Sequence, residues 1–309
     1  MAFSPSSRQS LAVVLSLMST LSACAPQDST PSAPSSFQTV QVDTAIVGLV
    51  VRLRHQPAGY TRIMHNKADA LPTASGWSTA FDGVWHLNNY PPVSKVRDGG
   101  APCSPPNVWS ATYRPGLLAG SGPVTLVGQS GPRATEARYW YIRICLKVGR
   151  NGKFENQATG TKMWFLSVGD APATGHCSII PMIKGDAVQA IKPDWNAMAT
   201  FECSGVLPTV RFLQIKSVDR PIKSDVWQVH EWLIDAGDID KTNGRFRWWI
   251  DGKLVLDHKN HKFRTTKSGY SHGLSRWRWA PTWGGTKGVR TRADDYRIDD
   301  VFVSQRGRL

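Results

Sequence analysis

The stretch Arg245-Phe-Arg-Trp-Trp-Ile250-Asp-Gly252-Lys253-Leu-Val-Leu-Asp257 carries the clearest structural signal in the chain. Two runs rich in aromatic and branched residues flank the dipeptide Asp251-Gly252, and such residues favour strands. Aspartate and glycine tolerate the positive φ angles of a type I′ turn, which joins the strands of a tight hairpin. The stretch therefore predicts a β-hairpin over 245–257.

Strand patterns continue on both sides of this hairpin. In the run 138–148 the apolar residues Trp140, Ile142, Ile144, Leu146 and Val148 alternate with a more polar set, so the run predicts a strand with one buried face. Similar runs predict strands at 45–53, 160–168, 210–215, 226–235 and 295–304. Residues 55–136 are rich in glycine and proline, which indicates loops between short strands such as 83–87 and 124–127.

The composition agrees with an all-β fold. Good helix-forming stretches are few, while the chain of 309 residues holds 13 tryptophans and 41% apolar residues, enough for a large core. We find no internal repeat, and we expect one domain over residues 37–309. The only glutamates are Glu136, Glu155, Glu202 and Glu231.

The N-terminus has the layout of an export signal. Arg8 precedes a short apolar run over 11–21, which is shorter than the roughly 20 apolar residues that span a bilayer. The following Leu21-Ser-Ala-Cys24 resembles the lipobox of bacterial lipoproteins. The resemblance implies a signal peptide over 1–23, lipid on Cys24 and a membrane anchor in the cell envelope. Because Ala25 follows the cysteine, it implies the outer membrane, and the Pro/Ser-rich residues 24–36 read as a solvated tether.

The net charge indicates which ligands the protein can bind. The formal net charge of +14 favours acidic ligands, and an exported protein would meet polyanionic glycans or membranes rather than nucleic acid.

Beyond Cys24, the four cysteines Cys103, Cys145, Cys177 and Cys203 predict two disulfides in an oxidising compartment, with the pairing open. Cys145 is the doubtful member, because a cysteine in the middle of a strand can simply be packed. No close Cys/His spacing indicates zinc.

Three blocks in residues 137–304 resemble the concanavalin A-like superfamily, and within it the jelly-roll polysaccharide lyases. They are the strand 138–148 with Gly160-Thr-Lys-Met-Trp-Phe-Leu166, then Trp227-x-x-x-Glu231 with 244–253, and finally Pro281-Thr-Trp-Gly-Gly285 with 295–304. The resemblance implies a β-sandwich of two curved antiparallel sheets, one of which forms a concave groove for a glycan. Fold alone does not give an activity.

The resemblance suggests residues for β-elimination on uronic acids. Gln228-Val-His230 is similar to the Gln-Ile/Val-His element of alginate lyases, but their Tyr-Phe-Lys-Ala-Gly block is absent. Glycoside hydrolysis is disfavoured, because no pair of closely spaced carboxylates of the glucanase type occurs. The candidate catalytic residues are His230, Tyr296 and Lys162, and the candidate substrate-binding residues are Arg143, Lys147, Gln228, Tyr139 and Tyr141. Tyr139 or Tyr141 is the expected stacking partner for a sugar ring.

Two further patterns remain open. The loop 235–244 contains alternating aspartates, as calcium loops do, but it lacks the spacing of an EF-hand and reads as a polar hairpin loop. We expect no cofactor, while a structural calcium stays possible. The run Arg276-Trp-Arg-Trp279, with Arg245 and Arg247, interleaves cations and aromatics in a way that suits an anionic glycan or cation–π pairs.

The sequence thus predicts a lipid-anchored jelly-roll protein that recognises an anionic polysaccharide. The alternatives are a polysaccharide lyase and a structural lipoprotein without a glycan ligand.

Overall fold

The computed structural model describes residues 55–68, 93–123, 126–128, 137–168, 177–187, 189–203, 212–266, 274–285 and 287–308. The signal and tether segments, Cys24 and the predicted strands 45–53 and 83–87 lie outside these residues. Among the described residues there is no helix that could span a membrane.

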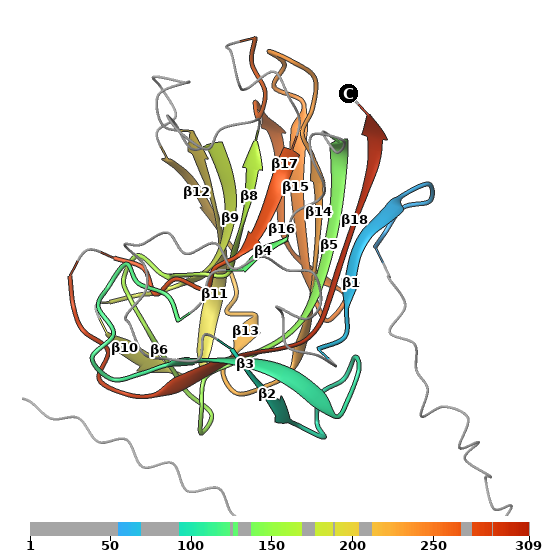
Figure 1. Cartoon of the computed structure of the whole chain (residues 1–309). Coiled ribbons are helices and arrows are strands. Elements are labelled where there is room, and N and C mark those ends of the chain that lie inside the picture. The colour runs from blue at the N-terminus through green and yellow to red at the C-terminus, as the bar shows by residue number, and fades with distance from the viewer. Residues whose placement is uncertain are drawn as a thin grey trace, which may run out of the picture. The chain divides into compact units, whose positions relative to one another are not determined.

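The described chain is built of antiparallel strands, as the sequence predicts (Figure 1). The strands are β1 (Thr61–Asn66), β2 (Ser94–Arg97), β3 (Asn107–Tyr113), β4 (Leu126–Gly128), β5 (Ala137–Val148), β6 (Phe154–Asn156), β7 (Thr161–Lys162), β8 (Trp164–Val168), β9 (Cys177–Lys184), β10 (Ala190–Lys192), β11 (Asp194–Cys203), β12 (Phe212–Lys216), β13 (Ile222–Lys223), β14 (Gln228–Asp235), β15 (Gly244–Ile250), β16 (Lys253–His261), β17 (Leu274–Trp279) and β18 (Asp294–Arg308).

The strands form two layers that face each other. The first layer has the order β1–β18–β5–β14–β15–β16, with β3 and β2 beside the start of β18. The second has the order β12–β11–β9–β8–β17–β4. The pair Leu274–Ala137 joins β17 of the second layer to β5 of the first. This arrangement is a jelly-roll β-sandwich, which confirms the predicted fold class.

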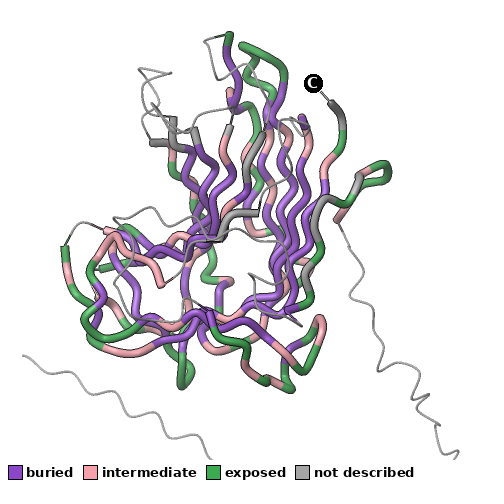
Figure 2. Tube along the Cα trace, viewed as in Figure 1, coloured by how far each residue is buried: buried purple, intermediate pink, exposed green. Residues whose placement is uncertain are grey.

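The predicted hairpin is confirmed in its details. Asp251 and Gly252 both have positive φ angles, of 51° and 82°, as a type I′ turn requires. The apolar face of the run 138–148 also lies where it was expected. Trp140, Ile142 and Ile144 are buried between the layers. Figure 2 shows the buried residues along the strands of both layers. Ring contacts join the layers, for example Trp164 on β8 with Trp232 on β14, whose ring centroids lie 5.2 Å apart.

One of the two predicted disulfides is present, and it involves the doubtful member. Cys103 is bonded to Cys145, and this bond ties the segment before β3 to the middle of β5. The other two cysteines, Cys177 and Cys203, are register partners on β9 and β11. A second bond between them remains a prediction, now with the pairing fixed by that register.

Candidate functional site

Charged side chains cover the outer face of the first layer, the face that points away from the second layer. Because side chains alternate along a strand, Tyr139, Tyr141 and Arg143 share this face of β5. The register aligns them with residues of β14 and β18 in successive rows. Tyr139 lies opposite Asp235 and Arg306, Tyr141 opposite Leu233 and Ser304, and Arg143 opposite Glu231 and Phe302.

The row around Arg143 is closed and paired. An Nη atom of Arg143 lies 2.5 Å from a carboxylate oxygen of Asp300. The Glu231 carboxylate accepts a 2.6 Å hydrogen bond from the Tyr141 hydroxyl. All four side chains are buried, with at most 5% of each residue exposed. Burial and the Glu231 charge raise the pKa of Tyr141, so this hydroxyl stays protonated and donates.

Residues 55–65, here called the strap, cover this row. The His55 ring stacks on Trp249 with 4.3 Å between centroids, and its Nδ1 lies 2.9 Å from a Glu231 oxygen. At the other end, Nε2 of His65 lies 3.1 Å from Asp300. Both histidine side chains are about one quarter exposed, at 24%. The strap therefore shields the buried charges from solvent and supplies each carboxylate with a second partner.

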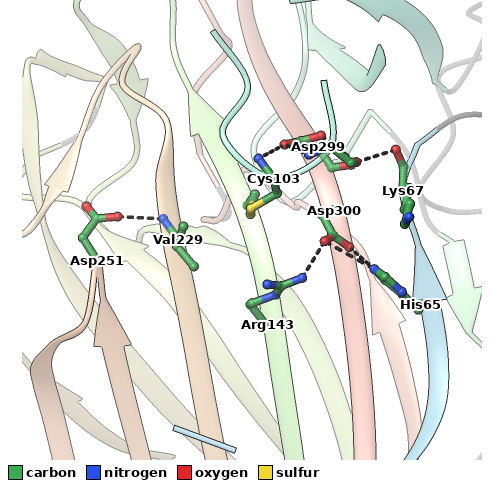
Figure 3. The surroundings of a disulfide bond; sticks show 10 residues. His65, Lys67, Cys103, Arg143, Val229, Asp251, Asp299 and Asp300 are labelled. Carbon is green, nitrogen blue, oxygen red and sulfur yellow. Dashed lines mark hydrogen bonds and ion pairs between the residues drawn. A yellow bond between two sulfur atoms is a disulfide. The ribbon is translucent and has the colours of Figure 1, made fainter. Parts of the chain in front are cut away.

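The disulfide closes the lower end of the same face (Figure 3). The backbone N–H groups of Cys103 and Ser104 donate to the Asp299 carboxylate at 2.5 and 2.8 Å. Lys147 also lies on this side, where its Nζ is 2.6 Å from Asp98. Its charge is matched, and its side chain is only 13% exposed.

The opposite end of this face is open and rich in arginine. We call it the arginine rim and define it by six residues: Tyr60, Arg138, Tyr139, Arg245, Arg247 and Arg306. Arg306 is exposed, and the other five are partly exposed. The rim draws on the strap and on the ends of β5, β15 and β18.

Two of the rim arginines are matched by carboxylates. Arg138 contacts Asp235 at 2.9 Å and Asp238 at 2.7 Å. Arg245 makes two bonds to Asp257, at 2.8 and 2.6 Å. These bonds raise the pKa of both guanidinium groups, and little free charge remains on them for a ligand.

The other two, Arg247 and Arg306, make no ion pair within the described part of the chain. Arg247 lies over the Trp249 ring at 5.4 Å, and its Nε is buried without a hydrogen-bond partner among those residues. Arg306 lies over the rings of Tyr60 and Tyr139 at 5.7 and 5.1 Å and donates to the Ala58 carbonyl. Burial raises the pKa of Tyr60 to about 12, although the positive charges of both arginines act to lower it. The rim thus presents two guanidinium groups that make no direct ion pair among the described residues, and the charges of both act on the Tyr60 phenol.

The candidate residues Gln228 and His230 do not lie on the same face as the candidates Arg143 and Lys147, so these four do not line one groove. His230 is paired in register with Ile144 and so faces the core, where it is 1% exposed. Its Nδ1 accepts a 3.3 Å hydrogen bond from Trp248, and burial lowers its pKa to about 3. Gln228 is also buried and bonds the backbone at Pro221 and Lys223. The two strands are neighbours, but the four residues divide between the two faces of the sheet.

The other two candidate catalytic residues lie apart from each other. Tyr296 is fully buried in the core between the layers. Lys162 lies on the second layer, where its Nζ is 5.2 Å from the Phe165 ring and Arg278 covers the same ring at 4.1 Å. The buried cluster that includes Phe165 is apolar, and its other members are Ile180, Met182, Met198 and Ala280.

The expected sugar-stacking tyrosines are both occupied. Tyr141 is fully buried under the strap. Tyr139 is partly exposed, but two guanidinium groups, those of Arg138 and Arg306, lie 5.0 and 5.1 Å from its ring centre. A sugar face therefore finds no open tyrosine face at Tyr139 in this arrangement.

The aspartates of the loop 235–244 are engaged by protein donors. Besides Arg138, Asp235 accepts from the Gly237 N–H at 2.8 Å, and Asp238 accepts from the Asn243 side chain at 2.7 Å. The loop closes on itself through these bonds, as the polar-hairpin interpretation expects.

Sequence reasoning missed the strap. Nothing in residues 55–65 indicates that they cover β5 and β14, because their partners lie more than a hundred residues away in the chain. Arg247 did give a signal, since the alternation of cations and aromatics in 245–249 is visible in the sequence.

The architecture was compared with solved structures. An endo-β-1,4-glucuronan lyase from the fungus Trichoderma reesei superposes with a TM-score of 0.55 at 12% identity, covering 80% of this chain and 96% of the lyase. The chain has the jelly-roll fold of these lyases. A marine PL-14 alginate lyase from Aplysia kurodai gives 0.53 at 12% identity over 80% of this chain and 100% of that one. An alginate lyase from a Chlorella virus gives 0.50 at 12% identity, covering 69% and 89%.

At the level of sequence, no protein-family model and no curated protein matches the chain. Identities this low show a shared fold and leave the activity open.

Proposed function

We propose that this protein binds an anionic polysaccharide at the arginine rim. The observation that carries the proposal is the pair of guanidinium groups, Arg247 and Arg306, that have no carboxylate partner among the described residues and flank Tyr60. A partly desolvated cation without a counter-ion gains most when an anion arrives. The net charge of +14 attracts such a ligand at long range.

Affinity electrophoresis tests this proposal. The protein should be retarded in gels that contain polygalacturonate and should migrate freely in gels that contain a neutral glucan. Each of Arg247→Ala and Arg306→Ala should weaken binding about tenfold, since one charge-assisted contact is lost. Retardation should also fall as salt rises, because exposed charges are screened.

Lys253→Ala is the matched control. Lys253 lies at the other end of the β15–β16 hairpin and is 74% exposed in an ion pair with Asp219, so its removal deletes one cation without touching the rim. Equal weakening by all three variants would reduce the effect to net charge and refute a site at the rim.

The second candidate function is β-elimination, and the His55–Glu231 pair favours it. A buried carboxylate that holds one histidine nitrogen is the usual way to orient a general base. With Nδ1 bonded to Glu231, Nε2 would take the C5 proton of a uronic acid, the electron pair of the C5–H bond would form the C4–C5 double bond, and the C4–O bond would break. The leaving oxygen would take its proton from a water molecule. An ultraviolet screen for unsaturated products over uronic-acid polymers, with His55→Ala as the comparison, decides between lyase and binding protein.

The proposal includes a lipid anchor on Cys24, supported by the sequence Leu21-Ser-Ala-Cys24 alone. Such a protein would sit in the cell envelope, at the outer membrane where two membranes exist. Cys24→Ser should abolish palmitate incorporation and leave an uncut precursor. Labelling of the variant at the level of the natural protein would remove the anchor from the proposal.

A further inference from the structure

We infer that the rim takes a linear chain carrying several negative charges, laid across the strands so that one anion meets Arg306 and another meets Arg247. The inference rests on the proposed function and adds the direction and the minimum length of the ligand.

The strand order sets the distance between the two cations. Arg306 lies on β18 and Arg247 on β15, with β5 and β14 between them. Three inter-strand steps separate the two strands by about 14 Å. A monosaccharide offers one carboxylate, whereas several linked charged sugars offer an anion to each guanidinium group.

The surface between the two cations accepts such a chain. Tyr60 lies between them and stays neutral, because its pKa is raised to about 12. The two carboxylates nearest this path, Asp235 and Asp257, are bonded to Arg138 and Arg245. The matched arginines thus remove the repulsion that these carboxylates would exert, and the unmatched ones supply the attraction.

The strap completes this path. Tyr60 belongs to the strap and packs against the cluster of Tyr141, Leu233, Trp249 and Phe302. The Ala58 carbonyl accepts a 3.2 Å hydrogen bond from Arg306 and thereby holds this guanidinium beside the Tyr60 ring.

Two linked anions bind more tightly than one because the second contact forms within the same complex. Affinity should therefore rise in a step, not gradually, at the length that first spans both arginines. Weak binding of a single charged sugar should be similar at either cation.

Titration calorimetry with galacturonic acid and its dimer, tetramer and hexamer tests this inference on the protein as it exists. We expect weak binding of the monomer and a gain of about tenfold or more between dimer and hexamer. Arg247→Ala and Arg306→Ala should each remove the step and leave short-oligomer binding within about twofold. Lys253→Ala should retain the step. The double variant should bind the hexamer more weakly than either single variant, because the contact with the remaining cation is then lost as well.

The outcomes separate the two proposals. Polygalacturonate binding with no step in length, or independent losses from the two arginine substitutions at every length, would overturn the inference while the proposed function stands. No binding of any anionic oligomer or polymer would overturn both. A step that also appears with neutral oligomers of equal length would show that charge spacing does not set it, and would likewise overturn the inference.

Discussion

The two ends of one sheet face treat arginine in opposite ways. In the row of Arg143, every charge is buried and matched, and the strap closes over it. Along the same strands, Arg247 lies one row away and Arg306 two rows away, and neither makes an ion pair with a carboxylate of the described residues. Both sets lie on the same face of neighbouring strands, so strand position alone does not distinguish them.

The comparison teaches that the cover over a sheet decides what its polar side chains do. Under the strap, a cation must be paired because water is excluded, and pairing leaves it nothing to offer a ligand. At the rim, solvent stabilises the unpaired guanidinium groups until an anion replaces the water. Substitutions that remove the partner of a buried charge, or free a cation at the rim, test this distinction.

The largest expected effect comes from the buried row. Arg143→Leu removes the guanidinium partner of the Asp300 carboxylate, which keeps its contact with His65, and the free energy of unfolding should fall by on the order of 3 kcal/mol. Urea denaturation measures this loss. Arg247→Leu at the rim should change stability by less than about 0.5 kcal/mol.

A double variant sharpens the interpretation. Arg143→Leu with Asp300→Leu removes both charges and should recover more than half of the loss, since no unpaired carboxylate is then buried. Equal losses of stability in Arg143→Leu and Arg247→Leu would contradict the distinction between the buried row and the rim.

The second effect is a pH dependence from the opposite face of β14. Burial holds the pKa of His230 at about 3, below its ordinary value of 6.5, so the folded state resists its protonation. The free energy of unfolding therefore keeps the full contribution of the neutral His230 above pH 6.5. It decreases as the pH falls from 6.5 towards 3, by up to about 1.4 kcal/mol per pH unit.

His230→Gln removes this titration and should flatten the stability profile in that window, even though the variant is less stable at neutral pH. Thermal melts at a series of pH values between about 7 and 4 measure the slope. An unchanged slope would mean that His230 is solvated and would contradict its place in the core.

The smallest expected effect is a gain in affinity for the polysaccharide. Asp257→Asn releases Arg245 from its bidentate ion pair and gives the rim a third uncompensated cation. Binding of polygalacturonate at low salt should tighten by about threefold, while stability changes by less than about 1 kcal/mol because the pair is partly exposed. Asp219→Asn frees the exposed Lys253 in the same manner and should not alter binding; a similar gain in both variants would point to net charge alone.

Local patterns in the sequence predict the strands that carry the site. Asp251-Gly252 specifies the turn between β15 and β16, and the alternation in 138–148 specifies which side of β5 is apolar. The strands β9 and β11 escape prediction for local reasons. β9 contains Pro181, which lacks a backbone donor, and β11 contains two alanines, an aspartate and an asparagine, which do not favour strands.

The division between matched and unmatched arginines lies beyond local patterns. Arg143 and Arg247 both alternate with apolar residues in strand-like runs, and either could serve a ligand. Their environments differ because Asp300 and the strap arrive from distant parts of the chain. Periodicity finds the face of a strand, but only the tertiary fold decides which part of that face is covered.

The two halves of the rim differ in how they form. Arg245 and Asp257, which flank Arg247 in the β15–β16 hairpin, are 12 residues apart, and a hairpin forms in microseconds from local contacts. The bond from Arg306 to Ala58 joins residues 248 apart, and such contacts form late because a long loop must close first. During refolding, the part of the site around Arg247 should therefore form well before the part around Arg306. A partly folded chain between these two steps would bind a single charged sugar but would not bridge two charges of a polymer.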